Sequence, residues 1–150
     1  MSQSTSIAII PEEETDFLKI LQGFLNTGWN FNDYGKITYI PLGGDAGDWE
    51  NASLDSQDKI LAIIKEKIEK NEDTGIVVMW QDTMIGGLLT YYPDTQTKKI
   101  FLLAELNRQT LKAHPAMQDI GDFTWYIEKM LPAFIDQKIH VFGVEASDYC

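Results

Sequence analysis

The sequence predicts a mixed α/β domain in which helices pack on a central, mostly antiparallel sheet. Three segments place apolar residues at helical spacing, and three short apolar runs follow one another with links of only a few residues. The 150 residues suit one domain, and residues 1–150 contain no linker, repeat or low-complexity segment. The predicted order of elements is α-β-α-β-β-β-α-β.

The first helix is expected to begin at Pro11, after a short strand over residues 6–10. A proline loses nothing by its missing N–H at the first helical position. The glutamates at 12–14 would then lie in the first turn, where the helix dipole favours negative charge. Gly28 is expected to end the helix, whose apolar face comprises Phe17, Ile20, Leu21, Phe24 and Leu25.

A strand is predicted over residues 36–42 and a loop over residues 43–53. The second helix begins near Ser53 or Asp55 and runs to about Lys70, with a charged, solvated back. The residues at helical spacing in this segment are Ile60, Ile63, Ile64, Lys67 and Ile68.

Three strands follow, over residues 75–80, 84–92 and 98–105. The connections are short: residues 81–83, and a turn at 93–95 that contains a proline. Such links between apolar runs predict an antiparallel meander.

The last helix is predicted over residues 121–137 and the last strand over 138–145. Residues 106–118 remain ambiguous, because the His114-Pro115 pair disfavours a helix. Pro132 is expected to kink the last helix. Its apolar face comprises Phe123, Ile127, Met130, Leu131 and Phe134.

The chain is strongly acidic, with 12 Lys+Arg against 23 Asp+Glu and a formal net charge of −11. This field repels nucleic acid backbones, which bind through cationic contacts. It attracts basic proteins and speeds encounter with them. The alternative is that the negative charge only keeps the protein soluble.

Cysteine usage and the N-terminal sequence predict a cytoplasmic protein. Cys150 is the sole cysteine, so no internal disulfide forms, as suits a reducing compartment. Residues 1–10 have no basic region or long apolar run, so we expect no signal peptide. No apolar stretch approaches the roughly 20 residues of a membrane span.

No arrangement typical of catalysis or of a metal site is found. The two histidines, His114 and His140, lack zinc-ligand spacing, and Gly-x-Ser-x-Gly is absent. Three glycines precede the second helix, but carboxylates surround them and residues 41–58 contain no Lys or Arg, which disfavours a phosphate. We therefore predict a protein that is not an enzyme and uses no cofactor or metal.

The acidic loop between the first strand and the second helix is a candidate binding segment. The EF-hand pattern fails, because Gly47, Trp49 and Glu50 stand at its positions 3, 5 and 6. A different cation site and a merely solvated loop remain open. We favour a protein interface, in which an aromatic supplies contact area and carboxylates select a basic partner. The expected contacts are Asp45, Asp48, Trp49, Glu50 and Asp55.

A second candidate segment is the aromatic stretch at residues 28–35. Its aromatics either cover the core as a lid or belong to the same binding surface. The expected contacts there are Trp29, Phe31, Asp33 and Tyr34. Trp80 and Trp125 are expected in the core, and at least one of Tyr91 and Tyr92 faces outward.

The order of the central elements is similar to that of GNAT acetyltransferases, with residues 75–80 and 85–89 resembling two of that family's strands. The resemblance implies a glycine-containing coenzyme A loop after the next strand. Residues 106–113 read Leu-Asn-Arg-Gln-Thr-Leu-Lys-Ala, without glycine. An acetyltransferase would therefore be degenerate, and this remains the alternative function.

The whole chain resembles the immunity proteins of bacterial toxin systems, including partners of contact-dependent growth inhibition toxins. The resemblance rests on residues 28–39 and on the acidic loop at 43–58, in a small acidic chain with one cysteine. It implies a protein that binds and neutralises a basic toxin domain, often a nuclease. It implies no nucleic acid or membrane partner and leaves the oligomeric state open.

Overall fold

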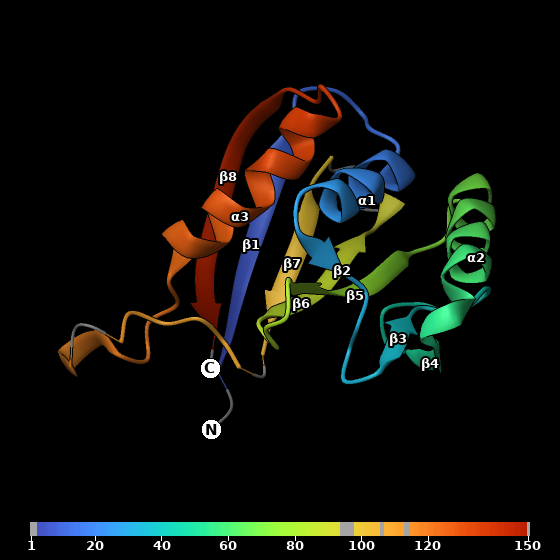
Figure 1. The fold of residues 1–150 in the computed structure, drawn as a ribbon. Coiled ribbons are helices and arrows are strands. Elements are labelled where there is room, and N and C mark those ends of the chain that lie inside the picture. The colour runs from blue at the N-terminus through green and yellow to red at the C-terminus, as the bar shows by residue number, and fades with distance from the viewer. Residues whose placement is uncertain (1–2, 94–97, 106, 113–114, 150) are drawn as a thin grey trace.

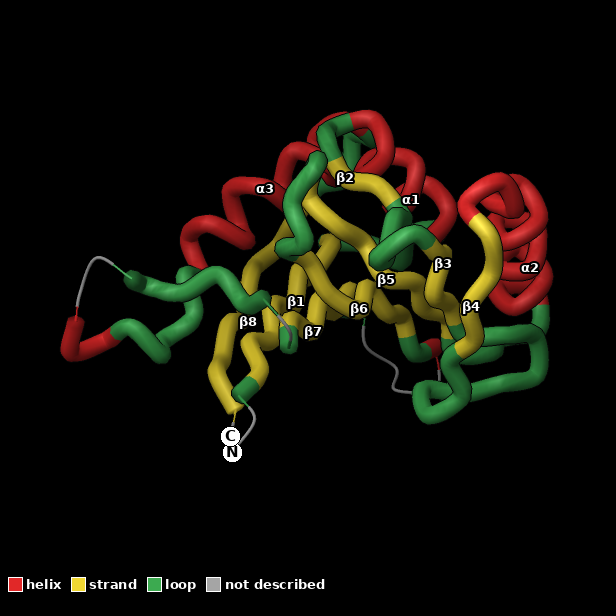
Figure 2. The backbone as a smooth tube through the Cα atoms, turned by 60° about the horizontal axis from the view of Figure 1, so that its bottom comes forward, coloured by secondary structure: helices red, strands yellow, loops and turns green. Residues whose placement is uncertain are grey.

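The computed structural model describes residues 3–93, 98–105, 107–112 and 115–149. It contains an eight-stranded sheet, with α1 and α3 side by side on one face of it and α2 beside its β3–β4 end (Figures 1 and 2). The elements are β1 (Ser4–Pro11), α1 (Phe17–Asn26), β2 (Trp29–Asn30), β3 (Lys36–Tyr39), β4 (Glu50–Ser53), α2 (Gln57–Glu69), β5 (Thr74–Trp80), β6 (Gly86–Tyr91), β7 (Ile100–Ala104), α3 (Phe123–Asp136) and β8 (Val141–Tyr149). Short 3-10 turns occupy Leu54–Ser56 and Pro115–Met117.

The sheet order is β4-β3-β5-β6-β7-β1-β8, with β2 paired to β5. Every strand pair in it is antiparallel, and β5, β6 and β7 form the predicted meander. The predicted fold class is confirmed, and the predicted order agrees in outline. The structure adds β2 and β4, and it makes β1 a full central strand between β7 and β8.

The start of the first helix differs from the prediction. Pro11 ends β1, paired with Val141 after a register shift, and does not begin a helix. The helix begins at Phe17, where the side chain of Asp16 accepts a hydrogen bond from the N–H of Leu18 at 3.0 Å. The three glutamates at 12–14 therefore lie in the connection and not in the first turn. β1 continues to Pro11 because β8 pairs with it along its whole length.

β4 was expected to be loop, and β8 reaches further along the chain than predicted. The β4 sequence, Glu-Asn-Ala-Ser, has no apolar alternation, because β4 is an edge strand with mostly exposed side chains. β8 was expected over 138–145 but spans Val141–Tyr149, since its polar end pairs with the start of β1. Pairing between residues far apart in sequence thus decides both boundaries.

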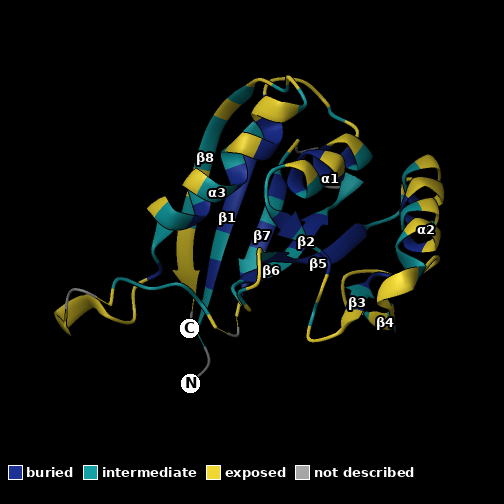
Figure 3. Ribbon diagram, viewed as in Figure 1, coloured by how far each residue is buried: buried dark blue, intermediate teal, exposed yellow. Residues whose placement is uncertain are grey.

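The core lies between the helices and one face of the sheet. Ile76 and Val78 of β5 and Leu102 of β7 point towards the helices and are fully buried. Figure 3 shows burial concentrated there, with exposed residues on the outer sides of the helices. α1 and α3 approach so closely at Gly23 that a Cβ atom there would clash with the carbonyl oxygen of Ala133.

Candidate functional site

Among the residues that the structure describes, no α-helix covers the opposite side of the sheet, which we call the open face. Side chains alternate along a strand, so residues between the core positions point to this side. Val77 of β5 pairs with Leu88 of β6, and Leu88 pairs with Leu103 of β7. These three residues form an apolar row across the middle of the open face.

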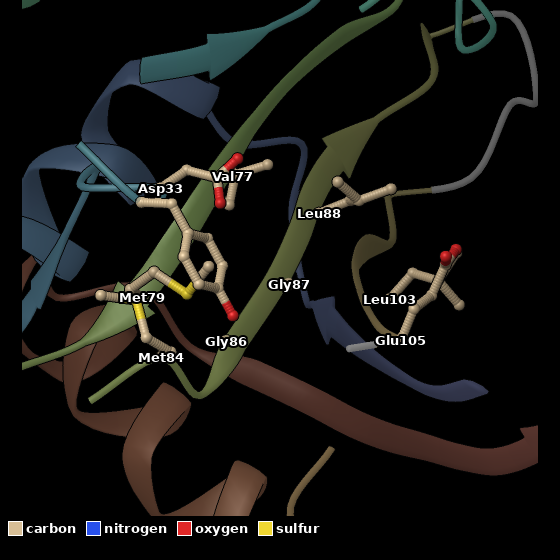
Figure 4. Close-up of a pocket in the computed structure, with 10 residues that line it drawn as sticks. Asp33, Val77, Met79, Met84, Gly86, Gly87, Leu88, Leu103 and Glu105 are labelled. Atoms are coloured by element: carbon tan, nitrogen blue, oxygen red, sulfur yellow. The ribbon is translucent and has the colours of Figure 1, made fainter. Parts of the chain in front are cut away.

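A pocket of about 150 Å³ lies on this row (Figure 4). Apolar side chains of β5, β6 and β7 form most of its wall, and two carboxylates, Asp33 and Glu105, lie on opposite sides of it in this view. Gly86 and Gly87 also line it, and neither position has room for a side chain. A Cβ atom would clash with the carbonyl oxygen of Val78 at the first and of Leu103 at the second.

Tyr34 lines the pocket and is hydrogen-bonded to the segment that follows β7. Its hydroxyl accepts a hydrogen bond from Nδ2 of Asn107 at 2.7 Å. Both residues have left-handed backbone conformations, with φ of 52° and 53°. Non-glycine residues adopt such angles at a cost, so the two loops are held in specific conformations beside the pocket.

Trp49 also lies on the open face. Its Cη2 atom would be 2.8 Å from a Cβ atom on Gly75, and Gly75 pairs with Thr90 on the same side of the sheet as Val77 and Leu88. The indole N–H donates to the carbonyl oxygen of Ala46 at 2.8 Å. Trp49 is half-buried by this packing, so it supports the fold as well as presenting an edge to solvent.

The acidic loop is attached to a buried lysine that the sequence interpretation placed on the apolar face of helix two. Nζ of Lys67 donates to the carbonyl oxygens of Pro41 at 2.7 Å and Gly44 at 3.1 Å. It also lies 3.0 Å from Oε1 of Glu72, and its side chain is fully buried. The cation that this loop holds is therefore the protein's own ammonium group.

Glu72 connects the same lysine to the loop backbone. Its Oε1 accepts a hydrogen bond from the N–H of Gly43 at 2.7 Å. That bond, with the contact to Lys67, lowers the pKa of Glu72 below its ordinary value. The corresponding feature of the sequence is a lysine at the helical spacing of Ile60 and Ile64, the two other buried residues of α2.

The structure brings part of the predicted contact set together. Asp33, Tyr34 and Trp49 lie on the open face, as the pocket and the packing on Gly75 show. Asp45 and Asp48 are exposed and hydrogen-bonded within their loop, where the N–H of Asp45 donates to Asp48 and the N–H of Gly47 donates to Asp45. The other two acidic residues of the predicted contact set, Glu50 and Asp55, are exposed in β4 and in the 3-10 turn that follows it.

Trp29 and Phe31 are corrected to core residues, because each is only 2% exposed. Trp29 packs against Trp80 and Trp125, and its indole N–H donates to the carbonyl oxygen of Lys129 at 2.8 Å. Of the two earlier interpretations of this stretch, covering the core fits these two aromatics. Trp80 and Trp125 pack on the core as expected.

Arg108 lies in the segment where the acetyltransferase resemblance would need a pyrophosphate cradle. Its guanidinium donates to Thr5 at 2.9 Å, to the carbonyl oxygen of Asp119 at 2.7 Å, and to Asp148 and Gln3. These bonds join β1, β8 and the segment before α3. The N-terminus of α3 lies beside this segment, where the N–H of Asp122 donates to the carbonyl oxygen of Gln109 at 2.9 Å and the N–H of Gln109 donates to the hydroxyl of Tyr126 at 2.9 Å. These backbone groups therefore already have protein partners.

The remaining candidates for chemistry are few. His140 is exposed just before β8, and His114 and Cys150 lie outside the described residues. Within the described part of the chain, no group of three His, Cys, Asp or Glu side chains is placed to hold a metal ion. No helix in that part is long and apolar enough to cross a membrane.

Comparison with known proteins adds no relative. No family model matches the sequence, and neither the curated proteins nor the solved structures gave a match.

Proposed function

We propose that this protein is a cytoplasmic immunity protein that binds and neutralises a basic toxin domain of a contact-dependent inhibition or related system. The toxin is expected to be a nuclease. The proposal includes no catalytic activity, cofactor, nucleic acid or membrane partner for the protein itself.

One observation carries the proposal: an apolar, helix-free sheet face is bordered by carboxylates in a chain of net charge −11. Binding surfaces commonly have an apolar centre that supplies affinity and a polar border that excludes water. A border of carboxylates selects a partner rich in Lys and Arg, and the overall field speeds encounter with it.

The proposed mode of action is occlusion. The basic surface of a nuclease binds the phosphates of its substrate. Carboxylates of this protein would occupy the same Lys and Arg side chains and block the substrate. Asp33, Tyr34 and Trp49 border the open face, and the loop with Asp45 and Asp48 extends the acidic surface beside Trp49.

The test is protection of growth. If a gene for a large secreted protein lies immediately upstream, its C-terminal domain is expressed in one bacterium, with and without this protein. The domain alone should suppress growth, and co-expression of this protein should restore it. The purified pair should associate more slowly as salt rises, because charges are screened beyond a Debye length of about 8 Å at physiological ionic strength. A growth curve that stays equally suppressed in both strains contradicts the proposal.

The alternative, a degenerate GNAT-like acyltransferase, is tested by calorimetric titration with acetyl-coenzyme A. The pocket on the open face, of about 150 Å³, is smaller than the roughly 300–1,000 Å³ of usual small-molecule sites. Two larger hollows, of about 490 and 450 Å³, each have four carboxylates in their walls, which disfavour a pyrophosphate. Arg108 is also occupied by four protein groups. We expect no heat of binding, and saturable micromolar binding would favour the acyltransferase.

A further inference from the structure

The pocket on the open face combines an apolar wall with a charged border of one sign. Val77, Met79, Leu88 and Leu103 supply apolar surface from three adjacent strands. Among the described residues that line the pocket, those with a charge are Asp33 and Glu105, and no Lys or Arg is present. Figure 4 shows these two carboxylates on opposite sides of the pocket.

The size of the pocket restricts what fits. Its volume of about 150 Å³ is below the roughly 300–1,000 Å³ of pockets that bind drug-sized ligands and cofactors. A single amino-acid side chain is a suitable occupant. Tyr34 keeps one edge in place through its hydrogen bond with Asn107, so the pocket has a defined shape before a partner arrives.

The carboxylates differ in what they already bind. Oδ2 of Asp33 accepts a hydrogen bond from Thr38 at 2.7 Å, which fixes that side chain at the border. The side chain of Glu105 is exposed and makes no hydrogen bond or ion pair with another described residue. One carboxylate is therefore oriented, and the other is available to a cation.

We propose that the pocket receives one Lys or Arg side chain of the toxin domain. The methylene stem packs on the apolar wall, and the charged end interacts with Glu105 at the border, while Asp33 adds negative charge from the opposite side of the pocket. Long cationic side chains bury their stems along apolar surface while the head stays with polar groups. The inference rests on the proposed function and deepens it, because it assigns a place on this protein to one basic side chain of the partner.

The experiment uses peptides as probes, because binding of one side chain can then be measured without the toxin. Four peptides, acetyl-Gly-Gly-Xaa-Gly-Gly-amide, carry Lys, Arg, norleucine or Glu at Xaa. Binding is followed in the full chain by NMR of ¹³C-labelled methyl groups of Met79, Met84, Leu88 and Leu103. The Lys and Arg peptides should shift these signals saturably and bind at least about threefold more tightly than the norleucine peptide. The Glu peptide should bind most weakly.

Two double variants separate the pocket from net charge. Asp33→Asn with Glu105→Gln keeps the shape of both side chains and should abolish the preference for Lys and Arg over norleucine. Asp58→Asn with Glu128→Gln removes the same charge from exposed positions on α2 and α3 and should retain the preference. Heteronuclear spectra of both variants check that the fold is unchanged.

Three results overturn the inference. The first is equal binding of the norleucine and Lys peptides, and the second is that no peptide shifts the methyl signals. The third is that both double variants lose the preference for Lys and Arg over norleucine to the same extent. Growth protection separates this inference from the proposed function. If the Asp33/Glu105 variant protects as well as the wild type, the pocket inference fails and the function stands. If the wild type gives no protection, the function fails whatever the peptides show.

Discussion

The ammonium nitrogen of Lys67 lies 3.0 Å from Oε1 of Glu72, in a side chain that is fully buried beneath the acidic loop. The same nitrogen donates to two loop carbonyl oxygens, those of Pro41 and Gly44. A lysine enclosed in this way is stabilising only while all of its partners are present. The loop conformation and the end of α2 are therefore coupled.

Lys67→Met should lower the free energy of unfolding by about 2–4 kcal/mol, because it leaves a carboxylate and two carbonyl oxygens without their donor. Chemical denaturation measures this change. Lys65→Met is the matched control, since Lys65 is exposed on the same helix, and it should change stability by less than about 0.5 kcal/mol. Equal effects of the two substitutions would show that the buried contacts contribute nothing.

The stability contributed by Glu72 should depend on pH. Its pKa is lowered in the folded protein, first by the N–H of Gly43 and then by Lys67, so the ionised form is favoured by folding. The stabilisation is present above the ordinary pKa of 4.5 and is lost as pH falls through the folded-state pKa. The difference in unfolding free energy between wild type and Glu72→Gln should therefore narrow as the pH falls below about 4.5.

Denaturation at a series of pH values follows this difference. Glu69→Gln, a substitution at an exposed position at the end of α2, serves as control. Its unfolding free energy should decline in acid as that of the wild type does. A gap between wild type and Glu72→Gln that stays constant with pH would contradict the assignment.

Gly23→Ala should destabilise the fold by about 1–3 kcal/mol, because the added methyl group would clash with the carbonyl oxygen of Ala133 where α1 crosses α3. Thermal melting measures the loss. Gly143→Ala is the control, since a Cβ atom there has open space. If the Gly23→Ala variant melts at the same temperature as the Gly143→Ala variant, α1 and α3 can move apart to accommodate the methyl group without loss of stability.

Trp49→Ala should lower both the melting temperature and the affinity for the toxin, because the indole packs on Gly75 and borders the open face. We expect an affinity loss above about 1 kcal/mol. Asp45→Asn with Asp48→Asn should instead slow association with little change in melting, since both side chains are exposed. Unchanged binding in both variants would remove the acidic loop from the interface.

The sequence predicted elements well where local pattern decides structure. The three helices and the β5–β7 meander have strong periodicity or short links, and they were found within a few residues apart from the start of α1. β4 and the end of β8 are polar, and only their pairing with β3 and β1 makes them strands. Long-range pairing leaves no local pattern in such segments.

The candidate site was predictable only where residue composition, a local property, indicates it. Aromatic and acidic composition drew attention to Asp33, Tyr34 and Trp49, which lie on the open face. Composition does not tell which aromatics face inward, so Trp29 and Phe31 were placed wrongly. Glu105 was not singled out, because the pocket that it lines also requires Asp33 and Tyr34 from the loop before β3, and no local pattern predicts where that loop lies on the sheet.

β1 lies between β7 and β8, so residues near the start of the chain pair with the last ones described. Ser4 pairs with Tyr149, and the hydroxyl of Thr5 donates to Asp148 at 2.7 Å across 143 positions of sequence. During synthesis, β1 and its apolar Ile7 and Ile9 must wait for β7 and then β8 to emerge from the ribosome. Contacts of such sequence separation slow folding. While β1 waits, it offers an unpaired strand to other chains, so aggregation competes with folding more strongly during translation than in the complete protein.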